Sequence, residues 1–132
     1  MLETGLYAGI LALIYVVLSM RTVRARIKLK TSLGDGGHPD LTRIIRVHGN
    51  FAEYTPLSLL MLALYEIGGG NMTALHVLGI TLVSARVLHI IGLGNNVMPA
   101  RVLGTALTMG VFITLAFLLI YGALIYGPSA QA

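Results

Sequence analysis

The residues of this chain with the clearest capacity for chemistry lie between Arg43 and Pro56, in the sequence RIIRVHGNFAEYTP. On a helix of about 3.6 residues per turn, positions three, seven or ten residues apart share one face. A charged group in the hydrocarbon of a bilayer costs about 2.5–3.5 kcal/mol on insertion scales, so such a face must meet partners or water inside a bundle. The side chains on this face are Arg43, Arg46, Asn50 and Glu53, with Tyr54 at its edge.

The composition of the chain predicts a membrane protein. It has 132 residues, of which 56% are hydrophobic and 11% are charged, and its mean hydropathy is +0.85. A water-soluble core would leave much of this apolar material uncovered. At about 20 residues per span, the length suits four transmembrane helices with short connections. We therefore expect an all-α integral membrane protein whose single domain, residues 1–132, is a four-transmembrane-helix bundle.

Glycine-rich breaks separate the apolar runs. Residues 34–39 and 68–71 read as turns. In the last run, Gly104, Gly110 and Gly122 are positions where another helix is expected to approach closely. The four helices are expected at residues 4–27, 41–67, 72–93 and 99–126.

The basic residues are concentrated in one segment. Seven of the nine Lys and Arg residues lie between Arg21 and Arg46. By the positive-inside rule this segment is cytoplasmic, which places both termini outside. Topology therefore explains the formal charge of +4, and no nucleic-acid partner is expected. The cluster from Arg21 to Lys30 is expected to anchor to lipid headgroups.

The same topology predicts which charges lie at equal depth. The second helix leaves the cytoplasm near Arg46 and the third returns to it near Leu93, so Glu53 and Arg86 should form an ion pair. Arg101 enters from the cytoplasmic side as well. A pocket between these residues would open toward the cytoplasm and favour a small anionic or zwitterionic ligand.

Other polar side chains have simpler interpretations. Glu66 and His76 lie near the outer boundary, where contact with water is expected. His48 lies about half a turn off the polar face and is expected to serve helix packing. The expected pair of Arg86 and Glu53 also has a purely structural interpretation, although ionisable residues inside membranes are more often functional.

The chain contains no cysteine, so any thiol chemistry must come from a ligand. A thiol with a reference pKa of about 8.5 is only a few per cent thiolate at neutral pH. Lowering that pKa by about two units corresponds to about 2.7 kcal/mol and makes the nucleophilic thiolate the major species. An arginine near the sulfur would have this effect because it stays charged when partly buried.

Three motifs carry a resemblance to a known family. They are RxxRVHGNFAEYTPLSLLML, SARVLH in the third helix and PAR at the start of the fourth. The chain resembles, over nearly its whole length, the MAPEG family of membrane-associated proteins in eicosanoid and glutathione metabolism. The resemblance implies a homotrimer of four-helix subunits that binds glutathione between neighbouring subunits near the cytosolic face.

The resemblance also assigns roles to residues of this chain. Arg101 matches, within one position, the arginine that faces the glutathione sulfur, which makes it the candidate catalytic residue. A first-helix arginine is also implied, and it is either Arg24 or Arg26. Glutathione is implied as the co-substrate, and no metal is implied. The other implied glutathione contacts are Arg46, Asn50, Glu53, Tyr54, Arg86 and His89.

Two departures from the family pattern indicate which branch of the family the chain resembles. Gly49 stands where the prostaglandin E synthase branch has a further arginine, and Leu93 stands where some members place a tyrosine. The chain looks more like bacterial glutathione transferase-like members, which implies a bacterial inner membrane. We expect a detoxifying transferase that conjugates glutathione to hydrophobic electrophiles from the bilayer, with peroxidase activity as a further reaction.

Two alternatives come from other functional classes. A non-catalytic lipid-binding or scaffold protein would use the same fold, since fold does not dictate function. A small multidrug/proton exchanger would need a membrane-buried carboxylate, usually in its first helix, where the chain has only Glu3 at the outer end. The presence of Arg46, Asn50 and Glu53 on the second helix favours the transferase over both alternatives.

Overall fold

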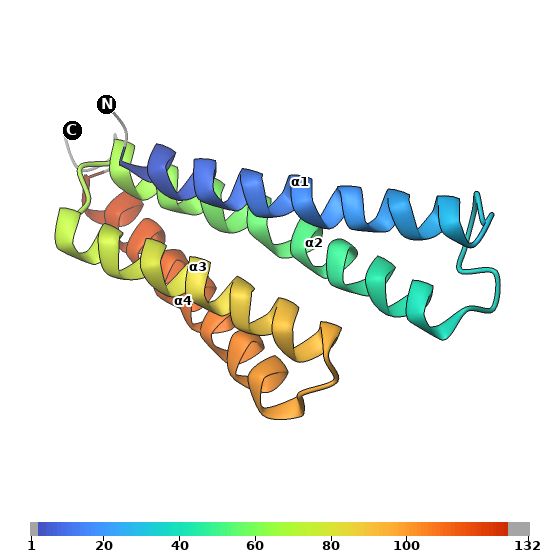
Figure 1. Cartoon of the computed structure of the whole chain (residues 1–132). Helices are drawn as coiled ribbons and strands as arrows, with labels where there is room; N and C mark the ends of the chain where they lie inside the picture. Colours follow the sequence, from blue (N-terminus) through green and yellow to red (C-terminus); the bar gives the residue numbers. More distant parts are fainter. Residues whose placement is uncertain (1–2, 127–132) are drawn as a thin grey trace.

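The chain folds into an antiparallel bundle of four helices (Figure 1). The structure is a computed structural model that describes residues 3–126. Helix α1 begins and α4 ends at the same end of the bundle, opposite the loop formed by residues 29–38. The expected all-α fold is confirmed. The helices are α1 (Thr4–Lys28), α2 (Pro39–Ile67), α3 (Met72–Gly94) and α4 (Met98–Tyr126).

The helices differ in how well they suit a membrane. Among the described residues, α1, α3 and α4 are long and apolar enough to cross a bilayer. Helix α2 has 29 residues but is not among them. By this criterion three of the four expected transmembrane helices are confirmed, and α2 is the exception. Its length is sufficient, but the polar face that begins near Arg43 lowers its apolarity.

Two hairpins form the bundle, α1 with α2 and α3 with α4. Helix α1 packs on α2 and α3, and α4 packs on the same two helices. Figure 1 shows the hairpins diverging toward the end that holds residues 29–38, where the first hairpin extends beyond the second. We call this the basic end, because seven of the nine Lys and Arg residues lie in or beside it. All four helices contribute to the core, for example through Leu11, Phe51, Leu82 and Leu115.

Helices α3 and α4 approach closely because two positions lack a side chain. A Cβ added to Gly104 would lie 2.6 Å from the backbone nitrogen of His89 and 2.7 Å from the carbonyl oxygen of Ala85. A Cβ added to Gly92 would clash with the backbone at the start of α4. Additions at Gly110 and Gly122 would meet nothing within 4 Å. The expected close approach is therefore confirmed at Gly104 and wrong for the other two within the single chain.

Polar contacts join three helices at the end opposite the basic end. The Glu66 carboxylate accepts hydrogen bonds from the backbone N–H groups of Glu3 at 2.5 Å and Thr4 at 2.9 Å, which caps the start of α1. The Tyr7 hydroxyl lies 2.8 Å from Nδ1 of His76. The side chains of Glu66 and His76 are both half-exposed, in line with the expected contact with water, and they make these specific contacts in addition. They satisfy backbone and hydroxyl groups that an apolar environment would leave unpaired.

The loop of residues 29–38 is held in shape by two side chains. Asp35 accepts hydrogen bonds from the Thr42 hydroxyl at 2.6 Å and the Gly37 N–H at 3.0 Å. These bonds, with that of Thr42 the larger, hold the pKa of the Asp35 carboxyl below its usual value. On the other side, Nη1 of Arg26 donates to the carbonyl oxygens of Thr31, Ser32 and Gly34 at 3.4, 3.2 and 2.9 Å.

We expect Gly104→Ala to destabilise the bundle, because the added Cβ overlaps backbone atoms that cannot rotate away. Overpacking of this kind costs about 1–3 kcal/mol. The control is Gly110→Ala, which adds the same atom to open space on the same helix and gains up to about 1 kcal/mol of helix propensity. Thermal melts followed by far-ultraviolet circular dichroism compare the two. Equal melting temperatures would show that the α3–α4 contact does not depend on Gly104.

Candidate functional site

The polar face of α2 straddles the edge of the core. Arg46 and Glu53 are exposed, whereas Asn50 and Tyr54 are half-buried and Phe51 is buried. Successive residues on a helix turn by about 100°, so Asn50 and Tyr54 lie between the exposed charges and the side that packs on the other helices. Asn50 and Tyr54 can therefore contact both an external ligand and the interior of the bundle.

Arg86 of α3 is the charged group at the centre of the bundle. Its side chain is only 1% exposed. Nη2 donates to Oδ1 of Asn50 at 2.6 Å, and Nη1 donates to Oγ1 of Thr108 in α4 at 3.4 Å. The guanidinium carbon lies 5.7 Å from the ring centroid of Phe51 and 5.7 Å from that of Tyr54, within cation–π range. Arg86 thus connects three helices.

The expected ion pair between Glu53 and Arg86 is not formed. Within residues 3–126, the polar partners of Arg86 are an amide and a hydroxyl rather than a carboxylate. Glu53 and Asn50 are three residues apart on α2, so their side chains point about 60° apart around the helix, and Asn50 is the one that reaches α3. The sequence predicted that Arg86 meets this part of α2, but it did not predict which side chain of α2 points toward Arg86.

His89 and Arg101 lie nearer the basic end than Arg86. His89 is 3% exposed, and its Nδ1 has no hydrogen-bond partner within the described residues. Arg101 is exposed in the first turn of α4, with its backbone packed against Gly92. Gly92 follows Arg86 by six residues, or about 9 Å along α3. Arg101 therefore stands at the mouth of the bundle, above the buried guanidinium.

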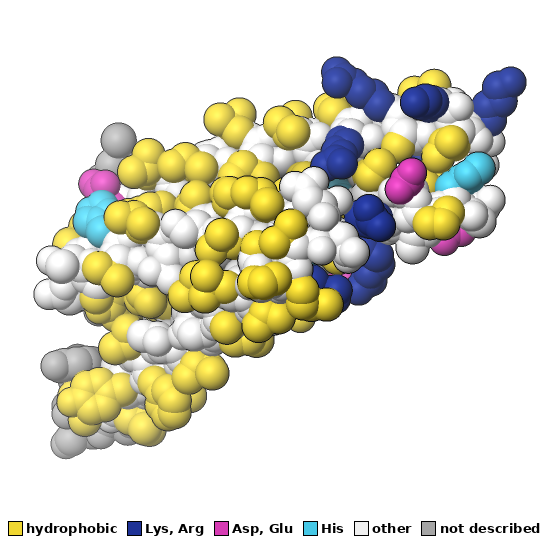
Figure 2. All heavy atoms as spheres, turned by 60° about the horizontal axis from the view of Figure 1, so that its bottom comes forward, with side chains coloured by type: hydrophobic (Ala, Val, Ile, Leu, Met, Phe, Trp, Pro, Cys, Tyr) yellow, Lys and Arg dark blue, Asp and Glu magenta, His cyan; other side chains and the backbone are white. Residues whose placement is uncertain are grey.

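The two candidate arginines of α1, Arg24 and Arg26, differ in their surroundings. Arg24 is exposed near the end of α1. Arg26 is half-buried and uses Nη1 to hold carbonyl oxygens of the loop of residues 29–38. Arg24 is therefore the better candidate for contact with a ligand. In Figure 2 the Lys and Arg side chains gather over one half of the visible face, while hydrophobic side chains cover the other half.

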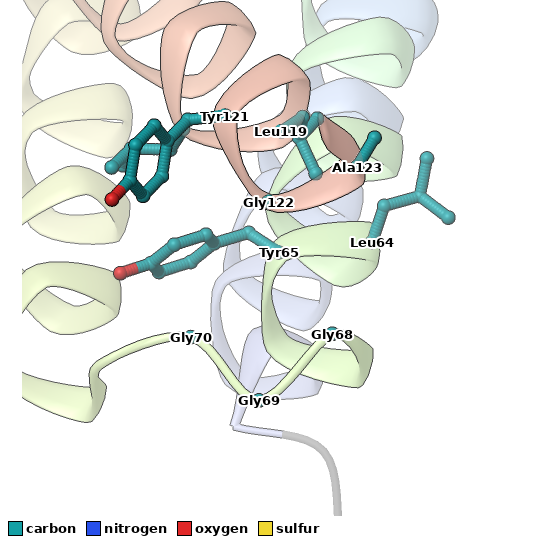
Figure 3. Close-up of a pocket in the computed structure, with 10 residues that line it drawn as sticks. Leu64, Tyr65, Gly68, Gly69, Gly70, Leu119, Tyr121, Gly122 and Ala123 are labelled. Carbon is teal, nitrogen blue, oxygen red and sulfur yellow. The ribbon is translucent and has the colours of Figure 1, made fainter. Parts of the chain in front are cut away.

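The larger cavities lie away from these polar residues. A cavity of about 560 Å³ is bounded by the α2–α3 turn and the last turns of α4, with the rings of Tyr65 and Tyr121 on one side (Figure 3). A second, apolar one of about 330 Å³ runs between α1 and α2. The space between Asn50, Tyr54 and Arg86 is only about 10 Å³. A tripeptide would therefore lie outside these residues, against the exposed face of α2.

Two further buried polar residues are Thr108 and Thr55, to which the sequence assigned no role. Thr108 is 1% exposed, and its hydroxyl donates to the carbonyl oxygen of Gly104 at 2.7 Å. Thr55 is 6% exposed and lines the groove between α1 and α2, where Oγ1 has no partner within the described residues. The available signal for Thr108 was a polar residue one turn after a glycine in an almost wholly apolar helix.

No cluster of three or more His, Asp or Glu side chains that could hold a metal ion occurs in the described part of the chain. The arrangement instead offers guanidinium groups, one amide and one carboxylate. These groups suit a small ligand that carries carboxylates and an amine.

Comparison with known proteins places the chain in a family. The model of the MAPEG family matches residues 4–121. The chain is also 32% identical over 105 residues to the inner membrane protein YecN of Escherichia coli strain K12, which covers 80% of each chain. The YecN protein of Escherichia coli O6:H1 strain CFT073 matches with the same identity and coverage. This chain is therefore a multi-pass membrane protein that belongs to the MAPEG family.

Proposed function

We propose that this protein is a membrane-bound glutathione S-transferase that activates the glutathione thiol as thiolate. The thiolate sulfur then forms a bond to an electrophilic carbon of a hydrophobic substrate, from which a leaving group such as halide departs. Membership of the MAPEG family supports this reaction class, since the family includes glutathione transferases. The proposed location is a bacterial inner membrane, with the site toward the cytoplasm.

The observation that carries the proposal is the arrangement around Asn50. Its amide is tied to the buried guanidinium of Arg86 at 2.6 Å, and the exposed Arg46 and Glu53 flank it on α2. Arginine binds carboxylates through its planar fork of donors, and a glutamate can hold an amine. Glutathione carries two carboxylates and one amine, so its charges complement this surface.

The chain's own residues divide into binding and activating groups. Arg46, Glu53 and the exposed Arg24 are proposed to bind the charged ends of glutathione, with Asn50 and Tyr54 behind them. Arg101 is proposed to stabilise the thiolate, because it lies in the first turn of α4, where free backbone N–H groups add positive potential. Arg86 and His89, which are buried, are proposed to support this surface from within.

Assembly as a homotrimer is part of the proposal. The observation behind it is the position of charged side chains on α2. Arg46 and Glu53 are exposed, and such charges need an environment other than lipid. Neighbouring subunits that cover this part of the chain would provide that environment.

We expect Arg101→Ala to raise the apparent thiol pKa of bound glutathione toward about 8.5, the value of an ordinary thiol. Arg101→Lys should keep part of the effect through charge alone. Ultraviolet thiolate absorbance measured against pH reports this directly, because the protein has no cysteine of its own. An S-methylated glutathione serves as the control for affinity. An unchanged thiol pKa in Arg101→Ala would assign the activation to another arginine.

We expect Glu53→Gln to weaken glutathione binding without lowering the melting temperature, because Glu53 is exposed and Arg86 does not depend on it. A hydrogen bond to a charged group contributes about 1.5–3 kcal/mol, so the loss should be roughly tenfold or more. Isothermal titration calorimetry measures the affinity. A variant that bound normally but melted earlier would mean that Glu53 has a structural role instead.

We expect the native mass in detergent, after subtraction of the micelle, to be about three times the 14.1 kDa of the chain. Ala52→Phe should weaken this assembly, since it fills the groove between α1 and α2 that we assign to the subunit contact. Light scattering coupled to size-exclusion chromatography gives both masses. A monomeric wild-type protein would contradict the trimer, and an intact trimer in the variant would contradict the assigned surface.

A further inference from the structure

Arg86 links Asn50 and Thr108 in a hydrogen-bond network, and the donor and acceptor of each bond follow from the chemistry of the groups. A guanidinium has donors and no acceptor. The atom of Asn50 that faces Nη2 at 2.6 Å must therefore be the amide oxygen. The amide nitrogen of Asn50, with its two N–H donors, then points away from Arg86. Within the described residues this nitrogen makes no hydrogen bond and is not among the buried unpaired atoms, so its donors are accessible from outside the bundle.

Thr108 lies at the other end of this hydrogen-bond network. Its hydroxyl donates to the carbonyl oxygen of Gly104 at 2.7 Å, so its own proton is not available to Arg86. The oxygen instead accepts from Nη1 at 3.4 Å. This bond is long, but it lies where both side chains are 1% exposed and where water does not compete for the donor.

The directional polar contacts of the guanidinium come from two side chains. Phe51 and Tyr54, each with its centroid 5.7 Å from the guanidinium carbon, limit movement of Arg86 toward either ring. The rings offer no directional hydrogen-bond acceptor, and Nε has no partner within the described residues. The bonds to Asn50 and Thr108 therefore orient the guanidinium, together with the covalent geometry and burial of its own side chain.

We propose that Thr108 is a positioning residue that, through Arg86, holds the Asn50 amide with its N–H donors directed at the ligand. This part of the site then selects a hydrogen-bond acceptor, such as a carboxylate or a peptide carbonyl, and discriminates against a donor. The inference rests on the proposed function, because the ligand it refers to is glutathione. Arg86 acts on the ligand through Asn50 and does not contact it.

The first experiment compares affinities for S-methylglutathione, whose blocked thiol separates binding from thiolate formation. Thr108→Val should weaken binding about fivefold, because the bond from Arg86 is long at 3.4 Å and its loss reaches the ligand only through Asn50. Thr108→Ser, which keeps the hydroxyl, should stay within about twofold of the wild type. Thr114→Val is the control, because Thr114 is exposed on the same helix. The thiol pKa of bound glutathione should be equal in all four proteins.

A second variant separates positioning from a structural role. Asn50→Asp offers Arg86 a carboxylate, so folding and melting temperature should be kept or improved. The group presented to the ligand changes from a donor to an acceptor, and binding should fall about tenfold or more. If Thr108→Val folds and binds as tightly as the wild type, or if Asn50→Asp binds normally, the inference is wrong.

A third measurement does not depend on glutathione. In nitrogen-15-labelled protein, the side-chain amide signal of Asn50 is identified by its absence in Asn50→Asp. Thr108→Val should shift this signal, whereas Thr108→Ser and Thr114→Val should leave it near its wild-type position. An unshifted signal in Thr108→Val overturns the positioning role. A shifted signal in a protein that binds no glutathione would support the positioning and reject the proposed function and the ligand assignment with it.

Discussion

A buried guanidinium without a carboxylate partner is the constraint on which the rest of this bundle depends. Arg86 is 1% exposed in a helix that is apolar enough to cross a membrane. An isolated charge in such surroundings is strongly unfavourable unless hydrogen bonds and polarisable groups surround it. Here an amide and two aromatic rings come from α2, and a hydroxyl comes from α4. The two hairpins must therefore keep the relative position that brings these groups to the Arg86 guanidinium.

Close backbone contact makes this arrangement possible. Thr108 reaches Arg86 because α4 lies against α3, and it does so one turn after Gly104, where a Cβ would overlap the backbone of His89. The carbonyl of Gly104 then accepts the Thr108 proton. One glycine thus brings the helices together and also orients the hydroxyl. A larger residue there would disturb the packing and the polar network together.

The sequence predicted the features that depend on composition and spacing along one helix. Four helices, the shared polar face of α2 and the close contact at Gly104 all follow from local patterns. It failed where the answer depends on rotation between helices. Periodicity places Asn50 and Glu53 on one face, but it does not say which of them meets Arg86. It also could not foresee that Glu66 caps α1, because that contact joins residues more than sixty positions apart.

The divergence of the hairpins gives Arg86 a role beyond its own solvation. At the basic end, the residues proposed to bind glutathione lie on α1 and α2, whereas Arg101 lies on the other hairpin, which turns away from the first (Figure 1). The 2.6 Å bond between Arg86 and Asn50 joins the hairpins below the point where they separate. A reacting sulfur and an activating charge must be placed within fractions of an ångström to be effective. This bond, together with the packing of α2 on α3 and α4, therefore contributes to that placement.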